Sequence, residues 1–436
     1  MRLNAISIAV FSASFWLAST AASDTLEQAV ERAVYTSPAL LQAHSRVRSF
    51  EENVNVARAD YYPTVFINGG IGEEQTDYLS GNNVDRRLET SELGVVVRQS
   101  LFSGLRTVND VSRLSAEERA ERYQLFAEAE STGMESIEVY LELLLAEKIL
   151  EVALQNQAEH EEVRDAVQNK VSNQLAPTSD LAQVEGRLAS ARSSAIAAQN
   201  RIFELKARYL ATIGEVPAEL IDPSSAQLTL PVDLPSAIDV AANGHPQILS
   251  SKESIEAAQG EYRAAKGLHS PEVYLELSAN RNDNNGGIEG LDENAAVMLR
   301  VEYQLFAGGG HSAQIRSSSH NVNAALNARR DAEIQVRQGV EISWYSSEYT
   351  SQQLDFLREN VRQSEEAERG YQSQYDVGRR DLLSLLIVKS ETFAARRSYL
   401  EVYYQNLIAQ YRVLYSMGTL LDSLTVEYPE EWEAEE

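Results

Sequence analysis

The stretch Tyr61-Tyr62-Pro63-Thr64-Val65-Phe66-Ile67 closes a segment that begins at Pro38, and the chain contains this segment twice. The second copy runs from Pro246 to Pro271 and continues as Glu272-Val273-Tyr274-Leu275-Glu276-Leu277. In both copies the prolines are 25 residues apart, so the copies are offset by 208. The pattern predicts a tandem duplication of a unit of about 200 residues, a period too long for a solenoid repeat.

A second pair of matching motifs follows the first. Gln99-Ser100-Leu101-Phe102-Ser103-Gly104 returns as Tyr303-Gln304-Leu305-Phe306-Ala307-Gly308, at an offset of 204. Long stretches with little Gly or Pro come after both motifs, which favours long helices. Each unit is therefore predicted to run helix, strand, loop, strand, long helix, turn, helix.

The predicted strands cover about 64–72, 93–102, 273–280 and 296–306. In the second unit apolar residues strictly alternate with polar ones, which is the period of a strand with one apolar face. These strands have about 8–11 residues, close to the ~9–11 of a tilted strand that crosses a bilayer. Four charged side chains on the polar faces are expected to meet water rather than lipid: Arg98, Glu276, Arg300 and Glu302.

The composition argues against a nucleic-acid-binding protein and excludes every kind of site that needs cysteine. The formal net charge is −27, which argues against a nucleic-acid partner because phosphate binding needs a basic face. The chain has no cysteine, so disulfides, thiolate metal sites and a lipidated cysteine are excluded.

The N-terminus has the pattern of a secretory signal peptide, predicted for residues 1–22. Arg2 precedes an apolar run from Ile6 to Leu17, and small residues near Ala22 suit cleavage. The alternative, a membrane anchor helix, is disfavoured because the run is shorter than the ~20 residues a span needs.

The remaining sequence divides into two repeats, 23–222 and 236–424, joined by a linker at 223–235. Each repeat is predicted to contain a long helical hairpin, at 105–213 and 311–417. The first repeat should begin with a helical part from Thr25 to about Asp60, broken near Ser37-Pro38 because Pro disrupts a helix interior. Residues 425–436 are expected to form an acidic tail, which should be disordered from Glu427 to Glu436.

Four strands cannot close a membrane barrel by themselves, since eight is the usual minimum. An open sheet in lipid would leave backbone groups unpaired, at several kcal/mol each. Helices of ~100 Å, at ~1.5 Å per residue, also exceed what one globular core covers. A barrel of twelve strands shared by three chains, with a bundle of helical hairpins below it, satisfies both constraints.

On these features the chain resembles the TolC-type outer-membrane channels, the family that serves drug efflux and type I secretion. The resemblance covers roughly Thr25 to Leu424. It rests on the duplication, on the Leu-Phe-Ser/Ala-Gly ends of the second and fourth strands, and on Tyr375-Asp376-Val377-Gly378-Arg379-Arg380-Asp381-Leu382-Leu383 at a hairpin tip. It implies a homotrimer in outer-membrane lipid, a mainly α fold with a β-barrel and a periplasmic tunnel, and two partners: a periplasmic membrane-fusion adaptor and an inner-membrane transporter.

The resemblance also implies a periplasmic gate at the helical tips. Tyr375 and Arg380 of the second hairpin take the positions of a Tyr and an Arg that bond to a Thr-Asp pair on the first, here Ser179 and Asp180. An Arg–carboxylate bond is strong yet reversible, as a gate requires. The alternative is a purely structural role, in which Ser179 and Asp180 cap a helix and Tyr375 is a packing residue. The expected contacts of the adaptor are the tip residues Pro177, Gly378 and Arg379.

The tunnel entrance departs from the family pattern. Two Asp residues usually lie one and two turns beyond the Arg, but Ser384 and Ile387 occupy these positions here, and Asp381 is a candidate substitute. The first tip, Gln174 to Asp180, is also longer than usual and contains Pro177. The missing Asp pair argues against an acidic, cation-binding entrance. The longer Pro-containing tip favours the type I secretion branch, including channels that export large adhesins.

The sequence contains no catalytic, phosphate-binding or metal-binding motif, so no enzyme activity, cofactor or metal is expected. His160-Glu161-Glu162 is interpreted as a solvated helix face. Two alternatives to a secretion duct stay open: the outer-membrane component of a drug or metal efflux pump, and a soluble periplasmic coiled-coil adaptor.

Overall fold

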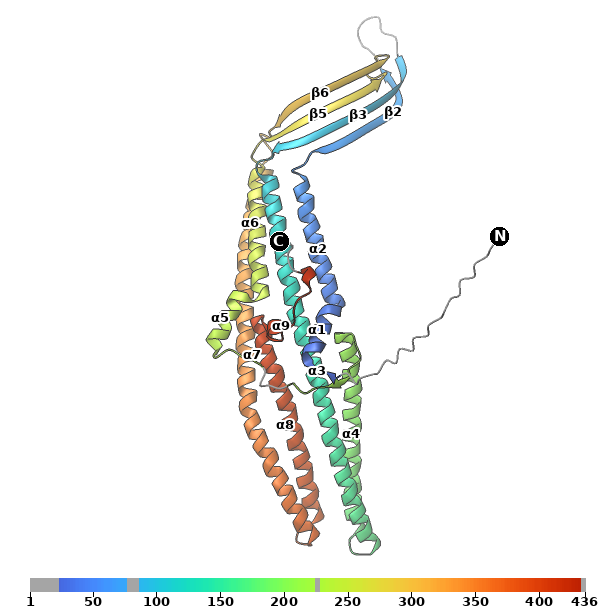
Figure 1. Ribbon diagram of the computed structural model, residues 1–436, viewed down its shortest axis with the longest axis vertical. Helices are drawn as coiled ribbons and strands as arrows, with labels where there is room; N and C mark the ends of the chain where they lie inside the picture. Colours follow the sequence, from blue (N-terminus) through green and yellow to red (C-terminus); the bar gives the residue numbers. More distant parts are fainter. Residues whose placement is uncertain (1–22, 77–85, 224–227, 433–436) are drawn as a thin grey trace, which may run out of the picture. The chain divides into compact units, whose positions relative to one another are not determined.

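The computed structural model describes residues 23–76, 86–223 and 228–432 (Figure 1). The predicted signal peptide and the turn at Gly81-Asn82-Asn83 lie outside these residues. The chain forms two compact units. Of the described residues, the tip unit comprises 23–33, 135–223 and 354–404, and the sheet unit comprises 34–76, 86–134, 228–353 and 405–432.

The helices repeat with the offsets found in the sequence. Two pairs are offset by 208: α1 (Leu26–Thr36) with α5 (Leu234–Gly244), and α2 (Pro38–Ala59) with α6 (Pro246–Gly267). Two pairs are offset by 204: α3 (Arg106–Ser172) with α7 (Gly310–Asp376), and α4 (Thr178–Ile213) with α8 (Leu382–Met417). Paired helices have equal lengths of 11, 22, 67 and 36 residues, which confirms the duplication.

The break that Pro38 predicts is present. α1 ends at Thr36 and α2 begins at Pro38, so the proline occupies the first helical position, where its missing N–H costs nothing. Pro246 begins α6 in the same way.

The sheet unit contains one antiparallel sheet with the strand order β2-β3-β5-β6 (Figure 1). The strands are β2 (Thr64–Thr76), β3 (Arg86–Phe102), β5 (Glu272–Asp283) and β6 (Leu291–Glu302). All four exist as predicted, and β2, β3 and β5 are longer because their hairpin partners continue the ladder into the expected loops. The predicted end of the fourth strand is wrong, since residues 303–306 form no strand.

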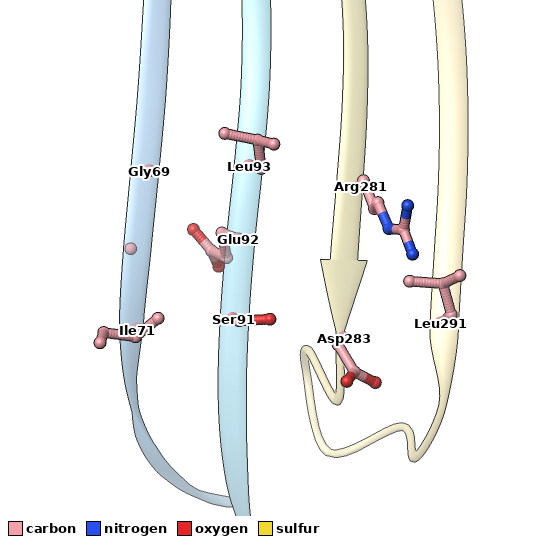
Figure 2. Close-up of a pocket in the computed structure, with 9 residues that line it drawn as sticks. Gly69, Ile71, Ser91, Glu92, Leu93, Arg281, Asp283 and Leu291 are labelled. Atoms are coloured by element: carbon pink, nitrogen blue, oxygen red, sulfur yellow. The ribbon is translucent and has the colours of Figure 1, made fainter.

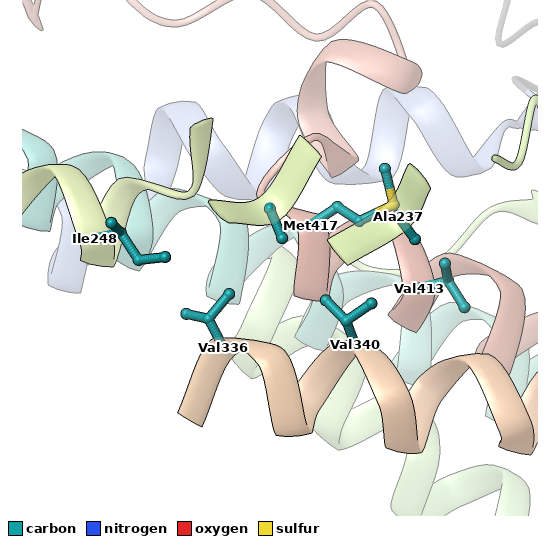
Figure 3. Packing of buried hydrophobic residues seen from close by; sticks show 7 residues of the cluster. Ala237, Ile248, Val336, Val340, Val413 and Met417 are labelled. Atoms are coloured by element: carbon teal, nitrogen blue, oxygen red, sulfur yellow. The ribbon is translucent and has the colours of Figure 1, made fainter. Parts of the chain in front are cut away.

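The helical part of the sheet unit has its own apolar core. Buried apolar side chains from α5, α6, α7 and α8 pack together there (Figure 3): Ala237, Ala241, Ile248, Val336, Val340, Val413 and Met417. The sheet unit therefore contains two separate apolar surfaces. One is the apolar face of the strands, and the other is this core between its helices.

The C-terminal residues correct another prediction, because 427–432 are not disordered. A short α9 (Leu420–Ser423) follows α8, and its first backbone N–H groups donate to the buried Glu130. Beyond it, Tyr428 packs on Phe126 at a centroid distance of 4.8 Å, and Trp432 is buried. Aromatic burial outweighs the acidic composition that suggested a solvated tail.

The tip unit ties the start of the first repeat to its end. β1 (Ser23–Asp24) pairs in parallel with β4 (Glu219–Leu220). The buried Tyr140 hydroxyl lies 2.6 Å from the carbonyl oxygen of Asp24 and accepts the N–H of Ile221 at 2.9 Å. The hydroxyl of Tyr209 donates to the Asp24 carboxylate, so both strands are held against α3 and α4.

Among the described residues, none of the helices carries an apolar run that could span a membrane.

Candidate functional site

One face of the four-stranded sheet is apolar and exposed. Val65 pairs with Val97, and Leu277 pairs with Val297, so one row across the sheet is entirely aliphatic. Ile67, Leu299 and Val301 on this face are between 65% and 74% exposed. A soluble monomer rarely exposes so large an apolar patch, and a membrane is the environment that suits it.

The opposite face carries charge. Glu276 lies between two arginines, with its carboxylate 3.0 Å from Arg98 and 2.7 Å from Arg300. Arg98 also lies over the ring of Tyr274, 4.7 Å from its centroid. This cluster agrees with the expectation that these side chains face water, since each charge would be costly in lipid.

The apolar band crosses the sheet obliquely. In the row that contains Gly69 and Leu93, the two remaining positions are Arg281 and Glu293, which form an ion pair at 3.7 Å. At the other end, Leu299 and Val301 extend the band on β6 past the start of β2. A band oblique to the strands is the geometry of strands tilted in a barrel wall.

A shallow groove of about 570 Å³ marks the loop end of this face (Figure 2). Its lining comes from all four strands: Gly69, Gly70 and Ile71 of β2, Ser91, Glu92 and Leu93 of β3, Arg281 and Asp283 of β5, and Leu291 of β6. Apolar and charged groups meet here, as they do at the edge of a membrane-facing surface.

The outer edges of the sheet belong to β2 and β6, each of which pairs on one side only within the described residues. Exposed strands of this length present a row of backbone donors and acceptors to a neighbour. The edges therefore indicate that the sheet is part of a larger one.

The tip of the second hairpin is a regular helix termination. Gly378 has φ of +74°, its N–H donates to Tyr375 O at 3.0 Å, and the N–H of Arg379 donates to Gln374 O at 2.8 Å. These two bonds form a Schellman motif, which requires a left-handed residue at the position of Gly378.

The first hairpin uses the same motif with an unusual residue. Gln174, which is offset from Gly378 by 204, has φ of +58°, and the N–H of Leu175 donates to Lys170 O at 2.8 Å. A non-glycine residue in this conformation costs about 1–2 kcal/mol. The duplication thus fixes the tip geometry even where the glycine is missing.

The predicted gate residues have specific partners in the chain. The hydroxyl of Tyr375, on α7, accepts a hydrogen bond of 3.3 Å from the ammonium of Lys170 on α3. This ammonium also lies 4.4 Å from the centroid of the Tyr375 ring. Arg380 donates from Nε to Gln374 at 3.2 Å and covers the ring of Tyr371 at 3.9 Å. The sequence did not single out Lys170 or Tyr371.

Ser179 and Asp180 lie together at the start of α4. Their side chains are 3.5 Å apart, and Asp180 lies in the first turn, where a carboxylate is favourable for the helix dipole. The interpretation of Ser179 as the helix cap is wrong, because α4 begins at Thr178 and the exposed Pro177 occupies the cap position.

Asp381 is the cap of α8. Its carboxylate accepts the hydroxyl of Ser384 at 2.6 Å and the N–H of the same residue at 3.1 Å, and these bonds hold the pKa of Asp381 below its usual value. Ile387, one turn further along, is 41% exposed. The three predicted entrance residues therefore lie along the first two turns of α8.

His160 corrects the expected solvated face. It is 2% exposed, and its Nδ1 lies 2.9 Å from Asn156 O. Burial lowers its pKa, so the ring is neutral at pH 7. Within the described residues no cluster of His, Asp and Glu could hold a metal ion.

A sheet with a lipid-facing surface, carried on long helical hairpins, defines the subunit of an outer-membrane channel. The model of the family "Outer membrane efflux protein" matches residues 29–208 and 237–419, and the chain belongs to this family. Proteins of the family are channels rather than enzymes, with a barrel in the outer membrane and a helical tunnel in the periplasm.

Curated relatives match most of the chain. The outer membrane efflux protein BepC of Brucella suis is 26% identical over 404 residues, which cover 92% of this chain and 86% of BepC. The outer membrane protein TolC of Salmonella enteritidis is 20% identical over 424 residues, covering 91% of this chain and 82% of TolC.

Solved structures share the fold. A membrane protein from Pseudomonas aeruginosa has a TM-score of 0.81 at 16% identity and covers 90% of both chains. The outer membrane protein VceC of Vibrio cholerae has a TM-score of 0.77 at 17% identity, covering 93% of this chain and 97% of VceC. Membership of the outer membrane efflux protein family excludes the soluble adaptor as an alternative.

Proposed function

We propose that the chain is the exit duct of a type I secretion system and carries a large, adhesin-like polypeptide. The observation behind this proposal is the entrance at α8. Ser384 and Ile387 provide no carboxylate, and Asp381 is engaged by Ser384. An entrance without a ring of free carboxylates gives no fixed preference for cations, which suits a polypeptide of mixed charge.

Transport through this duct is passive, and a gate closes it at the tips. In the assembled channel, Arg380 and Tyr375 bond to Asp180 and Ser179 across hairpins. Arg380 uses Nε for Gln374, so its two Nη groups are the part that meets a carboxylate. Such bonds are charge-assisted and reversible.

The duct is a trimer, as channels of this family are. The unpaired sheet edges are one support for association between chains, and an exposed stripe on α4 is a second. Ile196, Phe203 and Leu210 recur every seven residues on α4 and are 67%, 67% and 46% exposed. An exposed apolar stripe of this period is the seam of a coiled coil that lacks its partner within the chain.

The energy for export comes from an inner-membrane transporter, linked to the duct by a periplasmic adaptor that contacts the tips. The contact residues are Pro177, Gly378 and Arg379, which are exposed at the ends of the two hairpins. An exposed tip with a fixed backbone presents a rigid surface to a partner.

Efflux of drugs or metals is the second candidate. The matching family and its relative BepC are both named for efflux, which favours this candidate. The fold is the same, and the two functions differ in cargo and transporter.

A paired comparison in the native host separates the two candidates. In a strain that lacks the chain, we expect the loss of one large polypeptide from the medium or cell surface, with unchanged retention of a fluorescent efflux dye. Full-length chain supplied in trans should restore the polypeptide. Dye retention that rises while the secreted proteins stay unchanged would assign the channel to efflux.

Planar bilayers test the gate. Tyr375→Phe combined with Arg380→Ser should raise the resting conductance of the purified channel several-fold. Arg358→Ser, at an exposed arginine of α7, serves as the control. Equal conductance of all three proteins would contradict the proposed gate.

A further inference from the structure

A buried lysine joins three helices of the tip unit. Lys389 on α8 is 9% exposed at its side chain, and its ammonium lies 2.9 Å from Glu368 on α7 and 3.5 Å from Glu159 on α3. An ammonium taken out of water is costly unless carboxylates pair with it closely. Lys389 therefore holds both carboxylates in place, and the contact with Glu159 joins the second hairpin to the first.

An apolar cluster lies between this contact and the tips. It contains Val163, Val167 and Val184 of the first hairpin and Leu382 and Leu386 of the second. On α3 the positions run Glu159, Val163, Val167 and Lys170 in steps of four, four and three, which places them along one side of the helix.

A second lysine closes the cluster at the tip side. Lys170 reaches from α3 to Tyr375 on α7, as a hydrogen bond of 3.3 Å and a cation–π contact of 4.4 Å. Each hairpin thus sends one lysine to the other, with aliphatic side chains packed between the two. We call Lys170, Lys389, Tyr375, Glu159 and Glu368 the lysine bracket.

We propose that the lysine bracket holds the two hairpins of one chain together and sets the resistance of the gate to opening, with Lys389 as the positioning residue. This inference rests on the gated duct proposed above. It shares Tyr375 with the predicted gate links and adds four residues outside them: Lys170, Lys389, Glu159 and Glu368. Lys389 touches neither Tyr375 nor Arg380, so its effect on the tips passes through the packing of α3 against α8.

The physical reason is the contrast between a dry and a wet ion pair. While the aliphatic cluster excludes water, the attraction between Lys389 and its carboxylates is strong because the local dielectric is low. Once the hairpins separate and water enters, the same charges are hydrated and attract each other weakly. The bracket therefore has two states, closed and released, and few states between them.

The sharpest test removes only the link between hairpins. Glu159→Gln cuts the longer contact and leaves Lys389 paired with Glu368, so the fold of the second hairpin is kept. Glu162→Gln is the matched control, because Glu162 is an exposed carboxylate on the same helix. Lys389→Met removes both contacts while it keeps an apolar stem.

Two readouts are made on the purified full-length trimer. Resting conductance in planar bilayers should rise at least about threefold in Glu159→Gln, more in Lys389→Met, and not in Glu162→Gln. Because the chain has no cysteine, spin labels on Gln168→Cys and Leu383→Cys report the distance between α3 and α8. This distance should lengthen or broaden in the same order.

The outcomes separate the bracket from the gate itself. If Arg380→Ser raises conductance while Glu159→Gln and Lys389→Met change neither conductance nor label distance, the bracket proposal is wrong and the gate stands. If neither the unmodified channel nor Arg380→Ser conducts, the proposed duct fails. If Lys389→Met does not assemble, Glu159→Gln alone decides.

Discussion

Gly104 and Gly267 approach each other so closely that neither position has room for a side chain. A Cβ built on Gly104 would lie 2.5 Å from the carbonyl oxygen of Gly267, and one built on Gly267 would lie 2.6 Å from that of Gly104. This contact is where the chain leaves β3 for α3 beside the end of α6. It explains why the Phe-Ser-Gly motif ends in glycine.

Gly104→Ala should therefore destabilise the sheet unit. Gly104 has φ of +68°, so alanine adds about 1–2 kcal/mol of backbone strain to the clash with Gly267. We expect less assembled channel in the outer membrane and a lower temperature of trimer dissociation. Gly70→Ala is the control, because a Cβ there meets nothing within 4 Å. Identical behaviour of the two variants would show that the close approach is unimportant.

The face of the sheet decides the effect of a charge. Leu299→Arg places a charge on the apolar face and should cost about 2–4 kcal/mol near the middle of the membrane. Ser278→Arg places the same residue on the opposite face, where Arg300 and Arg98 already lie, and should be tolerated. The yield of heat-resistant trimer in outer membranes measures both. Equal loss in the two variants would argue against the assignment of the faces.

The stripe on α4 predicts a specific defect in assembly. Phe203→Glu puts a carboxylate in the exposed apolar stripe and should shift purified protein from trimer to smaller species. Ala197→Glu, at an exposed position on another side of α4, should leave the trimer intact. Light scattering in detergent gives the masses, and a stable Phe203→Glu trimer would remove the stripe from the interface.

We expect the buried carboxyl of Glu130 to make the stability of the sheet unit depend on pH. Burial raises its pKa to about 7 from 4.5, although the N–H groups of Leu420 and Leu421 and the hydroxyl of Tyr428 favour the ionised form. Between these values the folded state binds more protons than the unfolded one, so this carboxyl is stabilising at acid pH and loses that contribution as pH rises toward 7. The contribution of Glu130 to the free energy of unfolding falls by about 3 kcal/mol between acid pH and pH above 7.

Hydrogen exchange of the C-terminal residues measures this dependence. Protection of 420–432 should fall between pH 4.5 and 7.5 in the unmodified protein, after correction for intrinsic exchange. Glu130→Gln should flatten the change. Parallel pH profiles for the two proteins would mean that Glu130 does not titrate in this range.

The repeat made most of the fold predictable. Its two offsets fixed the paired helices, and strict alternation in Glu272–Leu277 identified a membrane-length strand before any contact was known. The ends of strands were harder to place. Residues 303–306 continue the alternation of β6 but form no strand, because pairing with β5 stops at Glu272.

The partners of the tip residues could not be read from the sequence. Lys170 and Tyr375 are 205 residues apart, and only the packing of two hairpins brings them together. Gln174 gave no signal for a left-handed conformation, which depends on its correspondence with Gly378 in the repeat. Trp432 lies among acidic residues, and its burial follows from tertiary contacts rather than from local composition.

The most direct test of the channel assignment is the mass of the native protein. The full-length chain is extracted from outer membranes in mild detergent without heating, and light scattering gives the protein mass of the complex. We expect about three times the mass of one mature chain, which is at most the 48.4 kDa of the full sequence, in a particle that requires detergent. A monomer that stays in solution without detergent would contradict the shared barrel and with it the channel.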